Sequence, residues 1–93
     1  MSQRKLKIDR KKIDQLDEKI FNLIKKRTYV VKHMLRLKKF KNQIVDRKRI
    51  NEILKNIKHK SVTNGIDPKI TNRIWKSMIW SYVVFQRKNF KRK

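Results

Sequence analysis

The first forty residues constrain this chain most, because they carry one helical pattern that no proline or glycine interrupts. From Gln3 to about Phe40, positions that step by four and three residues mark a single helix face. They are Leu6, Arg10, Ile13, Asp17, Ile20, Ile24, Arg27, Val31, Met34 and Lys38. Such a helix is about 57 Å long, whereas a globule of 93 residues has a radius of gyration of roughly 13 Å. The apolar stripe is longer than the core that one chain can form. We therefore expect a homodimer in which the first helix of one chain pairs with the first helix of the other.

Two shorter helices are expected after a polar break at residues 41–43. Asp46 is a good N-cap residue, Asn64-Gly65 is typical of a helix end, and Asp67-Pro68 is typical of a helix start. The chain has one glycine and one proline, fewer turn residues than a strand-rich fold needs. We therefore predict one all-α domain over residues 1–93, with three helices at about 3–40, 46–63 and 68–90.

Composition excludes several classes of protein. The chain has no cysteine, which rules out disulfides and thiolate metal sites. It has neither an apolar run of the roughly 18 residues needed to span a membrane nor a signal-peptide core. We expect a soluble, cytoplasmic protein with no membrane partner.

The net charge of +22 has two readings. A basic chain suits nucleic acid, because phosphate contacts dominate such binding. However, the 20 lysines outnumber the 9 arginines and occur with 12 isoleucines and 7 asparagines, a bias typical of an AT-rich genome. We favour the compositional reading and keep a basic helical nucleic-acid-binding protein as the alternative.

Cations on the apolar face are more informative than the total charge. Arg10, Arg27 and Lys38 share the stripe of the first helix with a single carboxylate, Asp17. Buried cations are costly unless they are paired. Arg10 could extend to solvent at a helix end, and Arg27 could pair with Asp17 of a second chain. The functional alternative is a pocket for an anion with several carboxylates, which arginine binds well.

Two polar groups on the later helices fit either alternative. Gln86 follows Tyr82 by four residues on an apolar face of the third helix. Its amide is either hydrogen-bonded within the core or a donor to a ligand. Arg49 lies in the first turn of the second helix, an end that favours anions.

Together these residues resemble the all-helical chorismate mutases over about residues 4–90. The matching segments are residues 8–20 with Arg10, the triplet Lys25-Lys26-Arg27, Lys38, the segment Asp46-x-x-Arg49, and residues 74–86 with the terminal Gln86. Gly65 and Asp67-Pro68 fall between the second and third helices as the family pattern requires.

The resemblance implies an intertwined homodimer with two active sites. Arg27, Lys38, Arg49 and Gln86 would come from one chain and Arg10 from the other. The arginines would hold the two carboxylates of a small dicarboxylate substrate, while Lys38 and Gln86 would donate to its ether oxygen. The further substrate-binding positions would be Asp46, Ile50 and Tyr82.

The implied reaction is the conversion of chorismate to prephenate in aromatic amino acid biosynthesis. This is a unimolecular pericyclic rearrangement, which needs no nucleophile, metal or other cofactor. The protein can accelerate it by holding the compact conformer and by placing positive charge where the ether oxygen gains electron density.

Two positions depart from the usual mutase pattern. Ile50 stands where most members carry a glutamate, and Tyr82 stands where most carry a serine. Both resemble the related isochorismate-pyruvate lyases, which form salicylate and pyruvate on the same fold, and so does the segment 27–32. We favour the mutase and keep the lyase as the alternative. A third alternative is a family member with little activity.

Overall fold

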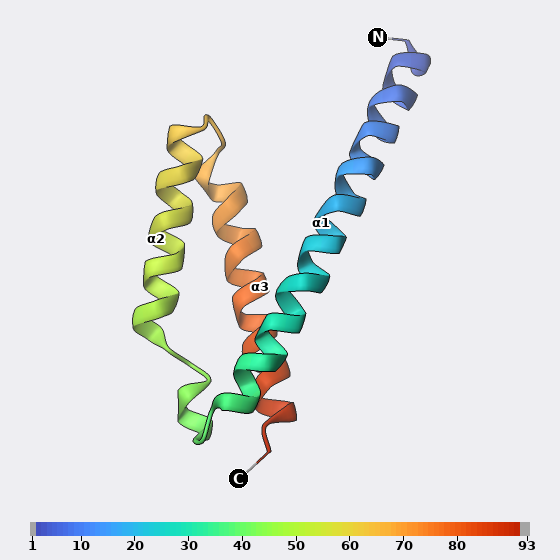
Figure 1. Cartoon of the computed structure of the whole chain (residues 1–93). Helices are drawn as coiled ribbons and strands as arrows, with labels where there is room; N and C mark the ends of the chain where they lie inside the picture. The colour runs from blue at the N-terminus through green and yellow to red at the C-terminus, as the bar shows by residue number, and fades with distance from the viewer. Residues whose placement is uncertain (1, 92–93) are drawn as a thin grey trace. The chain divides into compact units, whose positions relative to one another are not determined.

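The chain folds into three long α-helices and one short 3₁₀ helix in the computed structural model, which describes residues 2–91 (Figure 1). No strand occurs in this part of the chain. The elements are α1 (Gln3–Leu37), η1 (Lys41–Gln43), α2 (Arg47–Thr63) and α3 (Pro68–Asn89). The predicted all-α class with three helices is therefore confirmed. The chain divides into an N-terminal unit up to His33 and a C-terminal unit from Met34 onward.

The first helix ends three residues earlier than the predicted Phe40. The N–H of Lys38 bonds to the Leu35 carbonyl at 3.2 Å, a tightened last turn. The Oε1 atom of Gln43 then accepts hydrogen bonds from the backbone N–H groups of Lys39 (2.8 Å) and Phe40 (2.9 Å). These bonds offer the backbone partners outside the helix, so the chain turns away after Leu37 and forms η1 in the predicted polar break.

Helix α2 begins where its capping residue predicts. Asp46 has an extended backbone, and its Oδ1 atom accepts a hydrogen bond from the N–H of Arg49 at 3.0 Å. This bond pairs one of the donor groups that every helix leaves unpaired at its start.

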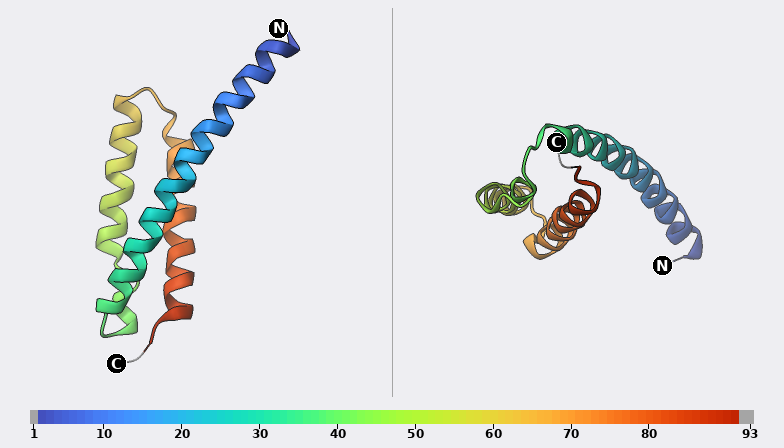
Figure 2. Two further views of the ribbon diagram at one scale, coloured as in Figure 1. Left: turned by 45° about the vertical axis from the view of Figure 1, so that its right-hand side comes forward. Right: turned by 90° about the horizontal axis from the view of Figure 1, so that it is seen from below.

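The turn between α2 and α3 also follows the sequence signals. Gly65 has φ +72°, the left-handed conformation that glycine adopts without strain. The N–H of Ile66 bonds to the Ser61 carbonyl at 2.8 Å, and the N–H of Gly65 bonds to the Val62 carbonyl at 3.3 Å, which is the Schellman arrangement. Asp67 then caps α3 through the N–H of Lys69 at 2.9 Å, with Pro68 in the first turn. Helices α2 and α3 lie side by side as an antiparallel pair (Figure 2).

The C-terminal unit has a small core that fixes the end of α3. Leu35, Ile44 and Val83 are buried together, and Val45 and Phe90 pack against them. At the other end of the hairpin, the buried Ser61 hydroxyl donates to the Ile57 carbonyl and shares a 2.6 Å hydrogen bond with the Thr71 hydroxyl. The Ser61–Thr71 bond therefore links α2 to α3 near the turn that joins them.

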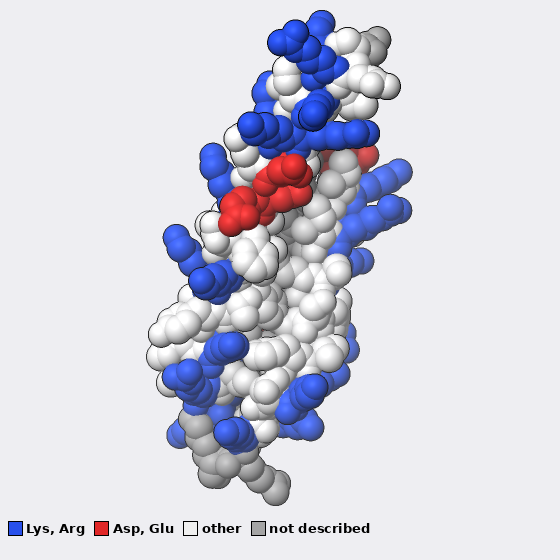
Figure 3. All heavy atoms as spheres, turned by 90° about the vertical axis from the view of Figure 1, so that its right-hand side faces the viewer, with Lys and Arg blue, Asp and Glu red and all other residues white. Residues whose placement is uncertain are grey.

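The apolar stripe of α1 is largely exposed. Ile13 and Ile20 each keep more than half of their surface accessible, at 55% and 53%. One face of the molecule shows uncharged side chains in its middle, lysines and arginines along its edges and at its upper end, and carboxylates in its upper half (Figure 3). An exposed apolar surface of this length is unusual for a protein that works as a single chain. None of the helices in the described part of the chain is long and apolar enough to cross a membrane.

Candidate active site

A direct hydrogen bond joins the two residues expected to act on the ether oxygen. Lys38 Nζ donates to Gln86 Oε1 at 2.7 Å, across 48 residues of sequence. Gln86 lies near the end of α3 with only 7% of its surface exposed, and Lys38 follows directly after α1. Since the Gln86 carbonyl is occupied by Lys38, its NH₂ group is the part of the amide that can donate to a ligand.

The Lys38 ammonium lies in a partly desolvated position. Burial lowers the pKa of Lys38 below the ordinary value of a lysine, because removal from water disfavours the charged form. The Asp46 carboxylate opposes this effect, since its negative charge raises the pKa of Lys38. Asp46 therefore has two roles, because the same side chain caps α2 through the N–H of Arg49.

Arg49 extends from the first turn of α2. Its guanidinium lies 3.6 Å from a carboxylate oxygen of Glu52, and both side chains are more than half exposed. Exposed ion pairs of this kind contribute only about 0–1 kcal/mol. A dianionic ligand could therefore draw the guanidinium away from Glu52 at little cost.

Ile50 and Tyr82 flank these polar groups along the chain. Ile50 follows Arg49 on α2 and is half-buried, and Tyr82 is half-buried one turn before Gln86 on α3. Tyr82 also interacts with another residue of the chain. The two residues belong to helices that pack against each other, so both lie on the hairpin that carries Gln86 and Arg49.

Arg10 and Arg27 lie on α1 in the N-terminal unit. Arg10 is exposed, and Arg27 is half-buried and engaged in a contact of its own. Arg27 follows Arg10 by seventeen positions of one helix, which corresponds to about 25 Å along the axis. One α1 helix cannot place both arginines on one small molecule, so a site that uses both needs two α1 helices.

The structure thus assembles the C-terminal half of the expected site. Lys38, Asp46, Arg49 and Gln86 belong to one unit and are linked by the contacts above. The participation of Arg10 and Arg27 stays a prediction. The closeness of Asp46 to Lys38 was not predicted from the residues; the only signal for it was the short connection between the two.

The assembled groups can donate hydrogen bonds and place positive charge. An ammonium and an amide directed at one oxygen stabilise negative charge that develops there. Within residues 2–91, no group of three or more His, Asp or Glu side chains could hold a metal ion.

Comparison with known proteins identifies one family. The family model described as chorismate mutase type II matches residues 9–87, a range that includes Arg10 and Arg27 and ends directly after Gln86. No curated protein and no solved structure matches the chain.

Proposed function

Because the chain belongs to the chorismate mutase type II family, we propose that it rearranges chorismate to prephenate. The observation that carries this proposal is the 2.7 Å hydrogen bond between Lys38 and Gln86. It holds an ammonium and a buried amide side by side, as a site for one electron-rich oxygen requires. Their positions on different elements are set by packing, so the two donors are organised before the substrate arrives.

In this proposal, Lys38 and the Gln86 NH₂ group bind the ether oxygen of chorismate. As the ether bond breaks, this oxygen gains electron density, and both donors bind it more strongly than in the ground state. Loss of one such donor costs about 2.7–4 kcal/mol in comparable sites. The remaining acceleration would come from holding the substrate in its compact conformer.

The two substrate carboxylates are assigned to the arginines. Arg27 and Arg49 would act in the chain that supplies Lys38 and Gln86, and Arg10 would come from a second copy. The separation of about 25 Å between Arg10 and Arg27 along α1 supports this division. The exposed apolar stripe of α1 supports a homodimer, because pairing two such helices would remove this surface from water.

The isochorismate-pyruvate lyase is the second candidate, and residue 50 favours it. Ile50 places an apolar, half-buried side chain next to Arg49 where most mutases carry a carboxylate. Glu52 does not replace that carboxylate, because two residues correspond to about 200° around a helix. Glu52 also pairs with Arg49 instead. Without a carboxylate at position 50, the ring hydroxyl of chorismate loses an acceptor.

One experiment separates the candidates. The purified protein is incubated with chorismate and, separately, with isochorismate, and prephenate is followed by absorbance and salicylate by fluorescence. Prephenate from chorismate supports the mutase, and salicylate from isochorismate without prephenate supports the lyase. Formation of neither product would contradict both proposals.

Variants tie the activity to the site. Lys38→Ala should abolish turnover, whereas Lys39→Ala, its exposed neighbour, removes the same charge and should leave turnover unchanged. An equal loss of turnover in both variants would show that turnover depends on the total charge and not on the Lys38–Gln86 pair. If the protein instead binds nucleic acid, its affinity for nucleic acid should fall steeply with increasing salt concentration. Either substitution should then leave binding largely intact.

A further inference from the structure

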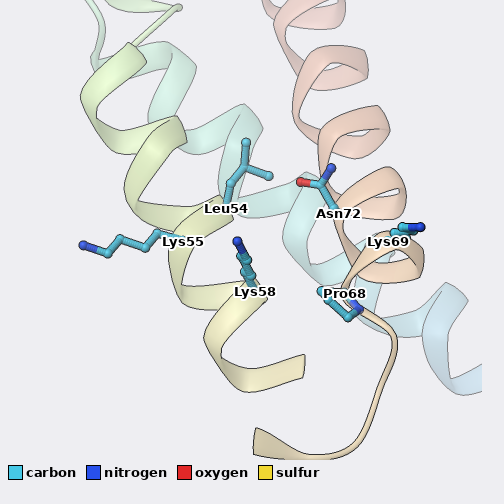
Figure 4. Close-up of a pocket in the computed structure, with 6 residues that line it drawn as sticks. All are labelled: Leu54, Lys55, Lys58, Pro68, Lys69 and Asn72. Carbon is cyan, nitrogen blue, oxygen red and sulfur yellow. The ribbon is translucent and has the colours of Figure 1, made fainter. Parts of the chain in front are cut away.

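A pocket lies between α2 and α3, near the turn that joins them (Figure 4). It has a volume of about 440 Å³ and is lined by Leu54, Lys55, Lys58, Pro68, Lys69 and Asn72. It is separate from the candidate active site, because Gln86 lies fourteen positions after Asn72 on α3, or about 21 Å along the helix. The residues of this lysine pocket have no part in the proposed reaction.

The lining of the lysine pocket is rich in positive charge. Three of its six lining residues are lysines and none is acidic. In the described part of the chain, none of these three lysines forms an ion pair. Of the carboxylates nearest in sequence, Glu52 contacts Arg49, and Asp67 lies next to the pocket residue Pro68, where its Oδ1 atom accepts a hydrogen bond from the backbone N–H of Lys69. Like charges around one cavity repel each other, so a bound anion would relieve a local cost.

The orientation of the side chains suits a ligand that bridges the two helices. Lys58 lies along α2, and Asn72 is turned from α3 toward α2 (Figure 4). Lys55 and Lys69 extend away from the pocket on opposite sides. A lysine has a flexible four-carbon stem, so both ammonium groups can swing over an anion that Lys58 holds. Leu54 and Pro68 supply apolar surface for the stems of the lysines.

We propose that the lysine pocket binds a small anion with two or more negative charges, of the phosphate class. Lysine recognises phosphate as a point charge, whereas planar carboxylates are gripped best by arginine, which the pocket lacks. The Asn72 amide adds a neutral donor. The bound anion links α2 to α3 and stabilises the hairpin that carries Arg49 and Gln86, because it binds the folded state alone. This site is independent of the proposed mutase activity.

The test uses the full chain, with inorganic pyrophosphate as the probe at constant ionic strength. Binding is measured by titration calorimetry and by the rise of the unfolding temperature. The triple variant Lys55→Gln, Lys58→Gln, Lys69→Gln should bind pyrophosphate at least about tenfold more weakly than the wild type. The control is the triple variant of Lys19, Lys41 and Lys60, each to Gln, which removes the same charge from exposed positions outside the pocket. It should lose less than about threefold.

Three results would overturn the proposal. They are an absence of pyrophosphate binding to the wild type, an equal loss in both triple variants, and a loss of binding in Lys38→Ala that matches the loss in the pocket variant. The last would place the anion in the candidate active site. If the pocket triple does not fold by circular dichroism, the single variant Lys58→Gln is compared with Lys60→Gln, and the same order of affinities is required.

Discussion

Replacing Gln86 with leucine tests the central pair of the candidate site. The substitution keeps a side chain of similar size in a position that is 7% exposed, and it removes both the acceptor for Lys38 and the NH₂ donor. Loss of one donor to the developing charge corresponds to about 2.7–4 kcal/mol of barrier, a decrease of roughly 10²–10³ in kcat.

The same substitution should cost a moderate amount of stability. A hydrogen bond to a charged group contributes about 1.5–3 kcal/mol. Lys38 is only half-buried and can turn its ammonium toward water, so we expect the lower end of this range. The free energy of unfolding, measured in urea, should therefore fall by about 1.5 kcal/mol.

A matched control and the kinetic pattern decide the outcome. Asn89→Leu changes another α3 amide, which is exposed and donates to the Phe85 carbonyl at 2.8 Å, and it should leave kcat unchanged. Turnover of chorismate to prephenate is followed by absorbance over a range of substrate concentrations. If Gln86→Leu raised KM but kept kcat, the amide would bind ground state and transition state equally, and the assigned role would be wrong.

Three further changes test the surroundings of this pair. Asp46→Asn keeps a good helix cap but removes the charge that raises the pKa of Lys38, so the alkaline loss of kcat/KM should move to lower pH; an unchanged pH profile would contradict the coupling. Ile50→Glu should raise mutase activity, whereas Asn51→Glu adds the same charge on an exposed position and should not; an unchanged or lower rate would refute the assignment of residue 50. Ile20→Asp on the α1 stripe should convert a dimer into monomers in analytical ultracentrifugation, because it would bury an unpaired charge; a wild type that sediments as a monomer would contradict the dimer.

The lowered pKa of Lys38 also determines the sign of a stability effect. A lysine whose pKa is lower in the folded than in the unfolded state binds fewer protons when folded, so stability rises with pH between the two values. Activity should change in the opposite direction over this window, because the reaction requires the protonated ammonium. The pH at which the protein is most stable and the pH at which it is most active should therefore differ.

Local signals in the sequence predicted the ends of the later helices well. Asp46, Gly65 and Pro68 act through hydrogen bonds or backbone angles within a few residues, and the structure places each as expected. The end of α1 was predicted three residues too late. The reason is that Gln43, beyond the expected end, reaches back to the N–H groups of Lys39 and Phe40.

The sequence by itself determined the helical class, the caps and the excess of positive charge, because each depends on residue type and on neighbours along the chain. The tertiary structure alone decided that Lys38 contacts Gln86, that Asp46 influences Lys38, and that lysines of two helices contribute to one pocket. These contacts join residues up to 48 positions apart. They exist because the core around Leu35 and Val83 and the packing of α2 on α3 bring distant side chains together.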